Sequence, residues 1–100
     1  MTTLTARLRK LSQRWPNSPV LSRQRGAVAG LLETLYPDHA GLRRKYLLLR
    51  VFNVDSVNDL QPCQVRALMA WLSPIRDSDG RLVPCMEAAQ DVWEFESAFV

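Results

Sequence analysis

Basic side chains near the starts of two expected helices are the residues of this chain whose type and spacing could support binding chemistry. In the helix expected over 22–36 they are Arg23 and Arg25, and in the helix expected over 39–53 they are Arg43, Arg44 and Lys45. Cations at this end oppose the helix macrodipole, whereas free backbone N–H groups and arginines together suit a phosphate group. The pattern therefore predicts an anion-binding surface, the alternative being arginines that are simply exposed to solvent.

Three more basic side chains recur at the helical period on the first expected helix, which begins at a Thr2 or Thr3 cap and ends at Pro16. Another face of this helix is apolar and is expected to be buried, with Leu4, Leu8, Leu11 and Trp15 along it. The residues predicted to contact nucleic acid are Arg7, Lys10, Arg14, Arg23, Arg25, Arg43, Arg44 and Lys45.

Charge is divided unevenly between the two halves of the chain. Residues 1–50 contain ten basic and two acidic side chains, a net charge of +8, whereas residues 51–100 contain three basic and eight acidic ones, a net charge of −5. Such a split indicates either a polyanion partner for the first half or internal pairing between the halves. The first hypothesis is a non-enzymatic module that binds nucleic acid, DNA rather than RNA, or an acidic protein surface, by electrostatic and weakly sequence-specific contacts.

The acidic C-terminal segment, 84–100, is predicted to be a helix or tail that meets a protein partner. Tryptophan is frequent among residues that dominate binding interfaces, so the residues predicted to contact a partner are Trp71, Trp93, Glu94 and Phe99. The second hypothesis is therefore a protein-interaction adaptor or inhibitor. A version of it is self-association, in which the basic half of one chain meets the acidic half of another.

Catalytic and metal-binding chemistry is not indicated by the other reactive side chains. His39 is the only histidine, which excludes a histidine cluster within one chain. Cys63 and Cys85 do not make a disulfide framework. Asp77 begins a run like a calcium loop, but its twelfth position is Ala88, which cannot coordinate. With no phosphate loop or nucleophile–base pair in the sequence, we expect no enzyme, no cofactor and no metal site.

Helical periods recur along the chain and predict an all-α fold. We expect one domain over 1–100, a compact bundle of four to five short helices with a small β-hairpin near 75–83. No run of about 20 apolar residues is present, so we expect a cytoplasmic protein with no membrane segment. Gly26 and Gly30 share a helix face and are expected to let a neighbouring helix approach closely.

The helix expected over 39–53 is predicted to be the most buried one, with Asp38 as its N-cap. Its expected core stripe contains Leu42, Tyr46 and Leu49, widened by Leu48 and Phe52. Asn53 is expected to end it in a left-handed conformation. The next helix is expected to begin at Pro62, with a core face formed by Val65, Leu68, Met69 and Leu72.

The order of residues across this connection carries a family resemblance. An apolar helix is followed by Phe52-Asn53-Val54, Ser56, Asp59-Leu60, Pro62, Gln64 and a helix that ends at Leu72. The pattern, over residues of about 30–72, resembles the helical C-terminal module of phage antirepressors and the regulatory protein of Mu-like phages. Both have glycine where this chain has Asn53. The resemblance implies a helical fold and a phage or mobile-element context, with a structural rather than a catalytic motif.

Overall fold

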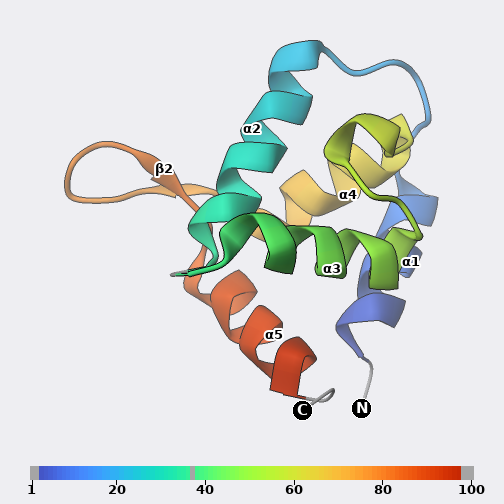
Figure 1. The fold of residues 1–100 in the computed structure, drawn as a ribbon. Coiled ribbons are helices and arrows are strands. Elements are labelled where there is room, and N and C mark those ends of the chain that lie inside the picture. Colours follow the sequence, from blue (N-terminus) through green and yellow to red (C-terminus); the bar gives the residue numbers. More distant parts are fainter. Residues whose placement is uncertain (1–2, 37, 98–100) are drawn as a thin grey trace.

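Five α-helices, one short 3-10 helix and a two-stranded hairpin form the described part of the chain, residues 3–36 and 38–97 of a computed structural model (Figure 1). The mainly helical bundle predicted from the sequence is therefore confirmed. Among these residues, no helix combines the length and apolar character that crossing a membrane requires. The elements are α1 (Leu4–Arg14), α2 (Ser22–Thr34), α3 (Ala40–Phe52), η1 (Val57–Asp59), α4 (Pro62–Leu72), β1 (Ile75–Arg76), β2 (Leu82–Val83) and α5 (Met86–Ser97).

Helix α4 lies between α1 and α2 and packs against both (Figure 1). Pro62 occupies its first turn as predicted, where a missing N–H costs no hydrogen bond. Gln61 directly precedes Pro62, and its backbone N–H donates a hydrogen bond of 2.8 Å to the side-chain oxygen of Gln64. The buried side of α4 is wider than predicted, because Ala67 and Trp71 are buried together with Val65, Leu68 and Leu72.

Helix α1 agrees with its prediction except at its end. The side-chain oxygen of Thr3 accepts a hydrogen bond of 3.2 Å from the N–H of Ala6, which caps the helix. Leu4 and Leu8 are buried, and Leu11 is partly buried against the core. Trp15 has extended backbone before Pro16 and is half-exposed, so it does not continue the buried stripe.

The buried face of α3 differs from the predicted one. Leu47, Leu48 and Val51 face the core, whereas Leu42 is 72% exposed and Tyr46 and Leu49 are also exposed. Only Leu48 and, in part, Phe52 of the predicted set pack inward. The prediction was wrong because apolar residues cover nearly the whole circumference of this helix, and periodicity alone then selects no face. α4, not α3, contains the larger number of buried side chains.

The N-cap of α3 also needs correction, whereas α2 begins at Ser22 as expected. At the start of α2 the Gln24 side chain accepts a hydrogen bond of 2.8 Å from the N–H of Leu21. His39, in a left-handed conformation with φ of 49°, takes the N-cap position of α3 that was predicted for Asp38. Asn53 does end α3 in a left-handed conformation, with φ of 56°, as predicted.

A hairpin and an acidic helix complete the chain. β1 and β2 pair antiparallel, and Gly80, with φ of 79°, supplies the left-handed residue of the turn between them. The Asp77 carboxylate accepts hydrogen bonds from the N–H groups of Asp79 and Arg81, both at 2.9 Å. The predicted hairpin is thus present, and the predicted acidic helix is α5, which buries Ala88, Val92 and Phe95.

The two glycines of α2 do not mark a close helix contact, contrary to the prediction. A Cβ added at Gly26 or Gly30 would meet no atom within 4 Å. We therefore expect Gly26→Ala and Gly30→Ala each to raise the free energy of unfolding by about 0.5–1 kcal/mol, because alanine loses less backbone entropy on folding. Urea denaturation measures this change. Gly80→Ala is the control and should be destabilising, since its φ disfavours a side chain.

Candidate nucleic-acid interface

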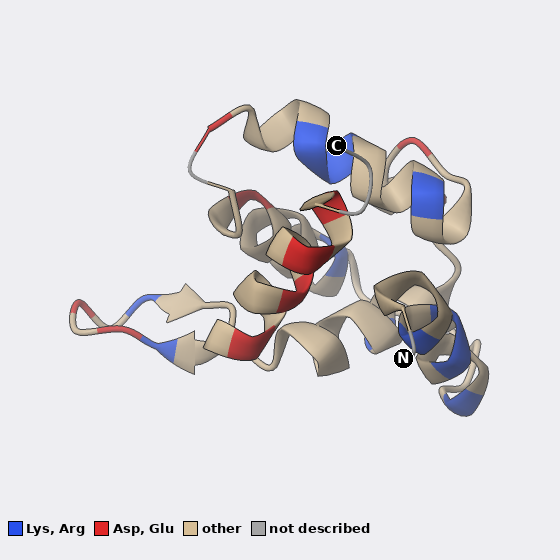
Figure 2. Ribbon diagram, turned by 90° about the horizontal axis from the view of Figure 1, so that it is seen from below, with Lys and Arg blue, Asp and Glu red and all other residues tan. Residues whose placement is uncertain are grey.

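Acidic α5 lies between basic α1 and basic α3, as the charge colouring in Figure 2 shows. Two ion pairs connect the basic half of the chain to this helix. Arg7 Nη1 lies 3.1 Å from Asp91 Oδ1, and Arg43 forms a two-pronged contact with the Glu96 carboxylate. Part of the charge split is therefore internal pairing, which was the alternative to a polyanion partner.

Arg43 is the most constrained of the predicted site residues. Its Nε donates to Glu96 Oε2 at 2.9 Å, its Nη1 donates to Asp38 Oδ1 at 2.9 Å, and its Cζ lies 4.5 Å from the centre of the Tyr36 ring. The hydrogen bonds to Glu96 raise the pKa of Arg43 further above its ordinary range. Burial, followed by the charge of Glu96, raises the pKa of Tyr36. Arg43 is thus held by two carboxylates and an aromatic ring.

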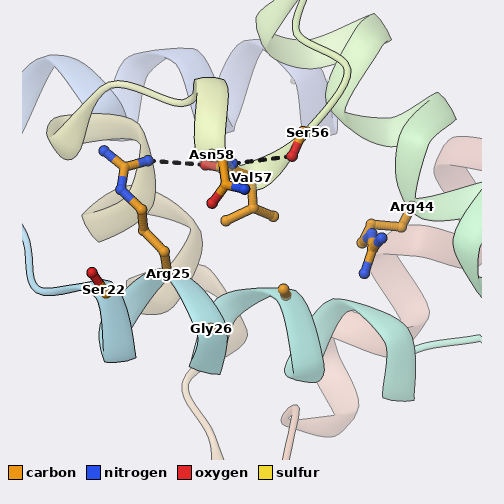
Figure 3. A pocket seen from close by; sticks show the side chains of 8 residues that line it. Ser22, Arg25, Gly26, Arg44, Ser56, Val57 and Asn58 are labelled. Atoms are coloured by element: carbon orange, nitrogen blue, oxygen red, sulfur yellow. Dashed lines mark hydrogen bonds between the residues drawn. The ribbon is translucent and has the colours of Figure 1, made fainter.

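Arg25 and Arg44 line a cavity of about 330 Å³ between α2, α3 and the 3-10 helix (Figure 3). Nη1 of Arg25 donates to the backbone oxygens of Val57 and Leu60 at 2.9 and 2.8 Å. Arg44 pairs with Glu33 at the far end of α2. Both arginines therefore secure the connection between helices, and their guanidinium groups already have protein acceptors.

Arg7, Lys10 and Arg14 form the basic stripe that the sequence predicts on α1. Together with Leu11 they line a shallow surface groove of about 290 Å³. Lys10 and Arg14 are exposed, and no carboxylate of the described residues lies within 4 Å of their charged atoms. Lys10 and Arg14 are therefore the part of this stripe that the fold leaves open to an anionic ligand, because Arg7 pairs with Asp91.

The other predicted basic residues belong to separate places. Arg23 is exposed in the first turn of α2, and Lys45 is exposed on α3. Neither pairs with a carboxylate of the part of the chain that the structure describes. The eight predicted residues are therefore divided among three helices. Four of them, Arg7, Arg25, Arg43 and Arg44, already have acceptors within the chain.

The predicted protein-contact residues have different surroundings. Trp71 lies in the core at 7% exposure, and its Nε1 donates to Asp91 Oδ2 at 2.9 Å. Trp93 is 70% exposed, and Glu94 beside it is also exposed. Phe99 lies outside the described residues. Of the described candidates, Trp93 and Glu94 are the pair presented to solvent.

Two arginines with a structural role were not singled out from the sequence. Arg9 Nε donates to the backbone oxygen of Val51 at 2.8 Å, at the end of α3. Arg66 Nη1 donates to the oxygens of Pro16 and Ser18 at 2.6 and 2.7 Å, which holds the loop between α1 and α2. No local pattern could identify them, because their acceptors are backbone atoms of distant segments.

The reactive side chains do not form a chemical centre among residues 3–36 and 38–97. Cys63 and Cys85 are free, partly buried thiols. No group of three or more His, Cys, Asp or Glu side chains in these ranges could hold a metal ion. No known family, no curated protein and no solved structure matches this chain. Its function is therefore interpreted from its own surface.

Proposed function

We propose that this chain is a cytoplasmic, non-enzymatic helical module of phage or mobile-element type that associates with nucleic acid through α1. The observation that supports it is the exposed stripe of Arg7, Lys10 and Arg14, whose last two members have no described carboxylate partner. Exposed lysine and arginine attract the phosphate backbone and release its counterions. The resemblance of 30–72 to phage regulatory modules supports the biological context.

The size of the stripe suits a short length of nucleic-acid backbone. From Arg7 to Arg14 the helix advances by roughly 10 Å at about 1.5 Å per residue, which corresponds to about three nucleotides of one strand. The side chains lie on an exposed face of α1 that is next to the face of the buried Leu4 and Leu8. Such contacts read charge and spacing rather than bases, so binding is weakly sequence-specific. The nucleic acid that we propose is DNA rather than RNA.

We expect Lys10→Gln/Arg14→Gln to weaken binding of a 20-base-pair duplex, because two phosphate contacts are removed. The slope of log K against log salt should become shallower by about two, one for each contact. Fluorescence anisotropy between low and moderate salt measures both the affinity and the slope.

The matched control is Arg76→Gln/Arg81→Gln, which removes the same charge from the hairpin on another part of the chain. It should change the slope much less than the α1 variant does. Equal effects of the two variants would mean that only net charge matters, and absence of binding to DNA and RNA at low salt would refute the proposal.

A second candidate function is a protein-interaction adaptor or inhibitor that uses α5. It is favoured by one observation, the exposure of Trp93 and Glu94 on a helix with no basic residue. Removal of 84–100 would also remove Ala88, Val92 and Phe95 from the core, so it would not test the surface alone. Trp93→Ala is the better variant, and an unchanged set of captured proteins would contradict this function.

A further inference from the structure

Trp15, at the end of α1, is a tryptophan whose ring has no partner within the described part of the chain. It is 42% exposed and does not belong to the hydrophobic core. Neither an aromatic ring, nor a guanidinium group, nor a hydrogen-bond acceptor of the described residues contacts its indole. Tryptophan offers a large apolar area for binding, so this ring is available to a ligand.

An apolar cavity of about 320 Å³ lies beside Trp15, between the loop after α1, the start of α2 and α4. Val20, Val65 and Met69 line it, and no acidic side chain of the described residues does. Gln24 lines it too, and because a backbone N–H binds the side-chain oxygen of Gln24, the amide N–H groups are left as donors. This volume is near the lower end of the range for small-ligand pockets, roughly 300–1,000 Å³. The cavity, which we call the Trp15 cavity, therefore suits one planar ring.

Unpaired cations are the sequence neighbours of two residues that line the Trp15 cavity. Arg14 directly precedes Trp15, and Arg23 directly precedes Gln24 in the first turn of α2. Both arginines are exposed, and neither pairs with a carboxylate of the described residues. Sites for single-stranded nucleic acid combine these two features, because cations hold the backbone while an aromatic ring stacks on a base.

The Trp15 cavity and the basic groove on α1 lie on the same side of the α1–α4 pair. Ala70 of α4 lines the cavity and also a third hollow, of about 540 Å³, which is lined as well by Arg7 and Leu11 of the basic groove. Arg14, which lines the basic groove, is directly followed by Trp15. A strand whose phosphates bind α1 therefore has the cavity next to it.

We propose that the nucleic acid held by α1 is single-stranded beside Trp15 and that one unpaired base stacks on the indole within the Trp15 cavity. Lys10, Arg14 and Arg23 bind the phosphates that flank this base. Two acidic side chains line the third hollow towards α5, so the strand runs along α1 and not past them. A base is favoured over an apolar peptide side chain as the occupant, because the unpaired cations require an anion beside the ring. The inference rests on the proposed function and specifies the form of the nucleic acid.

Two strands with the same number of phosphates separate base stacking from phosphate binding: an oligothymidylate and an abasic strand of equal length. Wild type should bind the thymidylate about 5- to 150-fold more tightly, the effect of stacking one base. Trp15→Ala should bind both strands as weakly as wild type binds the abasic one. Fluorescence anisotropy at low salt measures the four dissociation constants.

Trp93→Ala is the matched control, since Trp93 is also an exposed tryptophan but lies on acidic α5. It should keep the full preference for the thymidylate. Trp15→Phe retains a ring that stacks on a base, so it should keep part of the preference. This partial recovery separates the loss of stacking in Trp15→Ala from misfolding.

The results that would overturn the inference differ from those that would refute the proposed function. Equal affinity of wild type for the two strands would exclude a stacked base while leaving phosphate binding by α1 intact. An equal loss for both strands in Trp15→Ala, or a loss of the preference in Trp93→Ala, would do the same. If neither strand nor the duplex binds at low salt, the proposed function fails and this inference with it, which would leave the Trp15 cavity to an apolar segment of a protein.

Discussion

Leu48→Ala is expected to lower the free energy of unfolding by about 2–5 kcal/mol, the range for truncating a fully buried leucine. The side chain is 1% exposed and lies in the core with Leu47 and Val51, so its removal leaves a cavity that neighbouring helices can fill only in part. Urea denaturation followed by circular dichroism measures the loss. The midpoint should fall with little change in slope, since the denatured chain is altered only by three carbon atoms.

Leu42→Ala provides the control on the same helix with the same chemical change. Leu42 is mostly exposed, so the variant should stay within about 0.5 kcal/mol of wild type in dilute protein. The two variants together locate the buried face of α3. A large loss for Leu42→Ala and a small one for Leu48→Ala would favour the face expected from sequence over the face in the structure.

Asp91→Ala has the second largest expected effect, a loss of about 2 kcal/mol. Asp91 accepts hydrogen bonds from Trp71 Nε1 at 2.9 Å and from Arg7 at 3.1 Å, so it connects α4, α1 and α5. Without it the indole N–H of a buried tryptophan has no acceptor, which costs about 1–3 kcal/mol. The lost pair with exposed Arg7 contributes little. Thermal or urea unfolding measures the change.

Asp91→Asn separates the hydrogen bond from the charge. The amide oxygen can still accept from Trp71, so stability should fall by less than half as much as in Asp91→Ala. Arg7 loses its carboxylate partner and joins Lys10 and Arg14 as an available cation, so affinity for duplex DNA should rise several-fold at low salt. If Asn and Ala variants are equally unstable, the negative charge rather than the acceptor is what holds the three helices together.

Local rules predicted most of the elements, because the relevant partners are close in sequence. Thr3, Pro62, Asn53 and the turn at Asp77 act on backbone groups within a few residues, and each has the expected role. The face of α3 could not be predicted in the same way. Its burial depends on where α1, α2 and α5 lie, and a helix with leucines on most sides is compatible with several orientations.

The hydrogen-bond partners of the arginines could likewise not be predicted from the sequence. The sequence predicted that Arg43 lies near the start of a helix. It could not predict that Arg43 binds both Asp38 and Glu96, because Glu96 is 53 residues away. Those acids supply the negative charge that the first turn of α3 lacks. The stripe on α1 was predictable because helical spacing alone brings Lys10 and Arg14 together, and no described carboxylate pairs with these two residues.

The basic positions differ in whether lysine can replace arginine, because some arginines bind backbone oxygens and others are only exposed charges. Arg9, Arg25 and Arg66 each donate to two or more carbonyl groups of a remote loop or helix end. A lysine ammonium keeps the charge but cannot reproduce this planar fork. Homologous chains should therefore exchange arginine and lysine freely at 10 and 14, where only charge is needed, while retaining arginine at 9, 25 and 66.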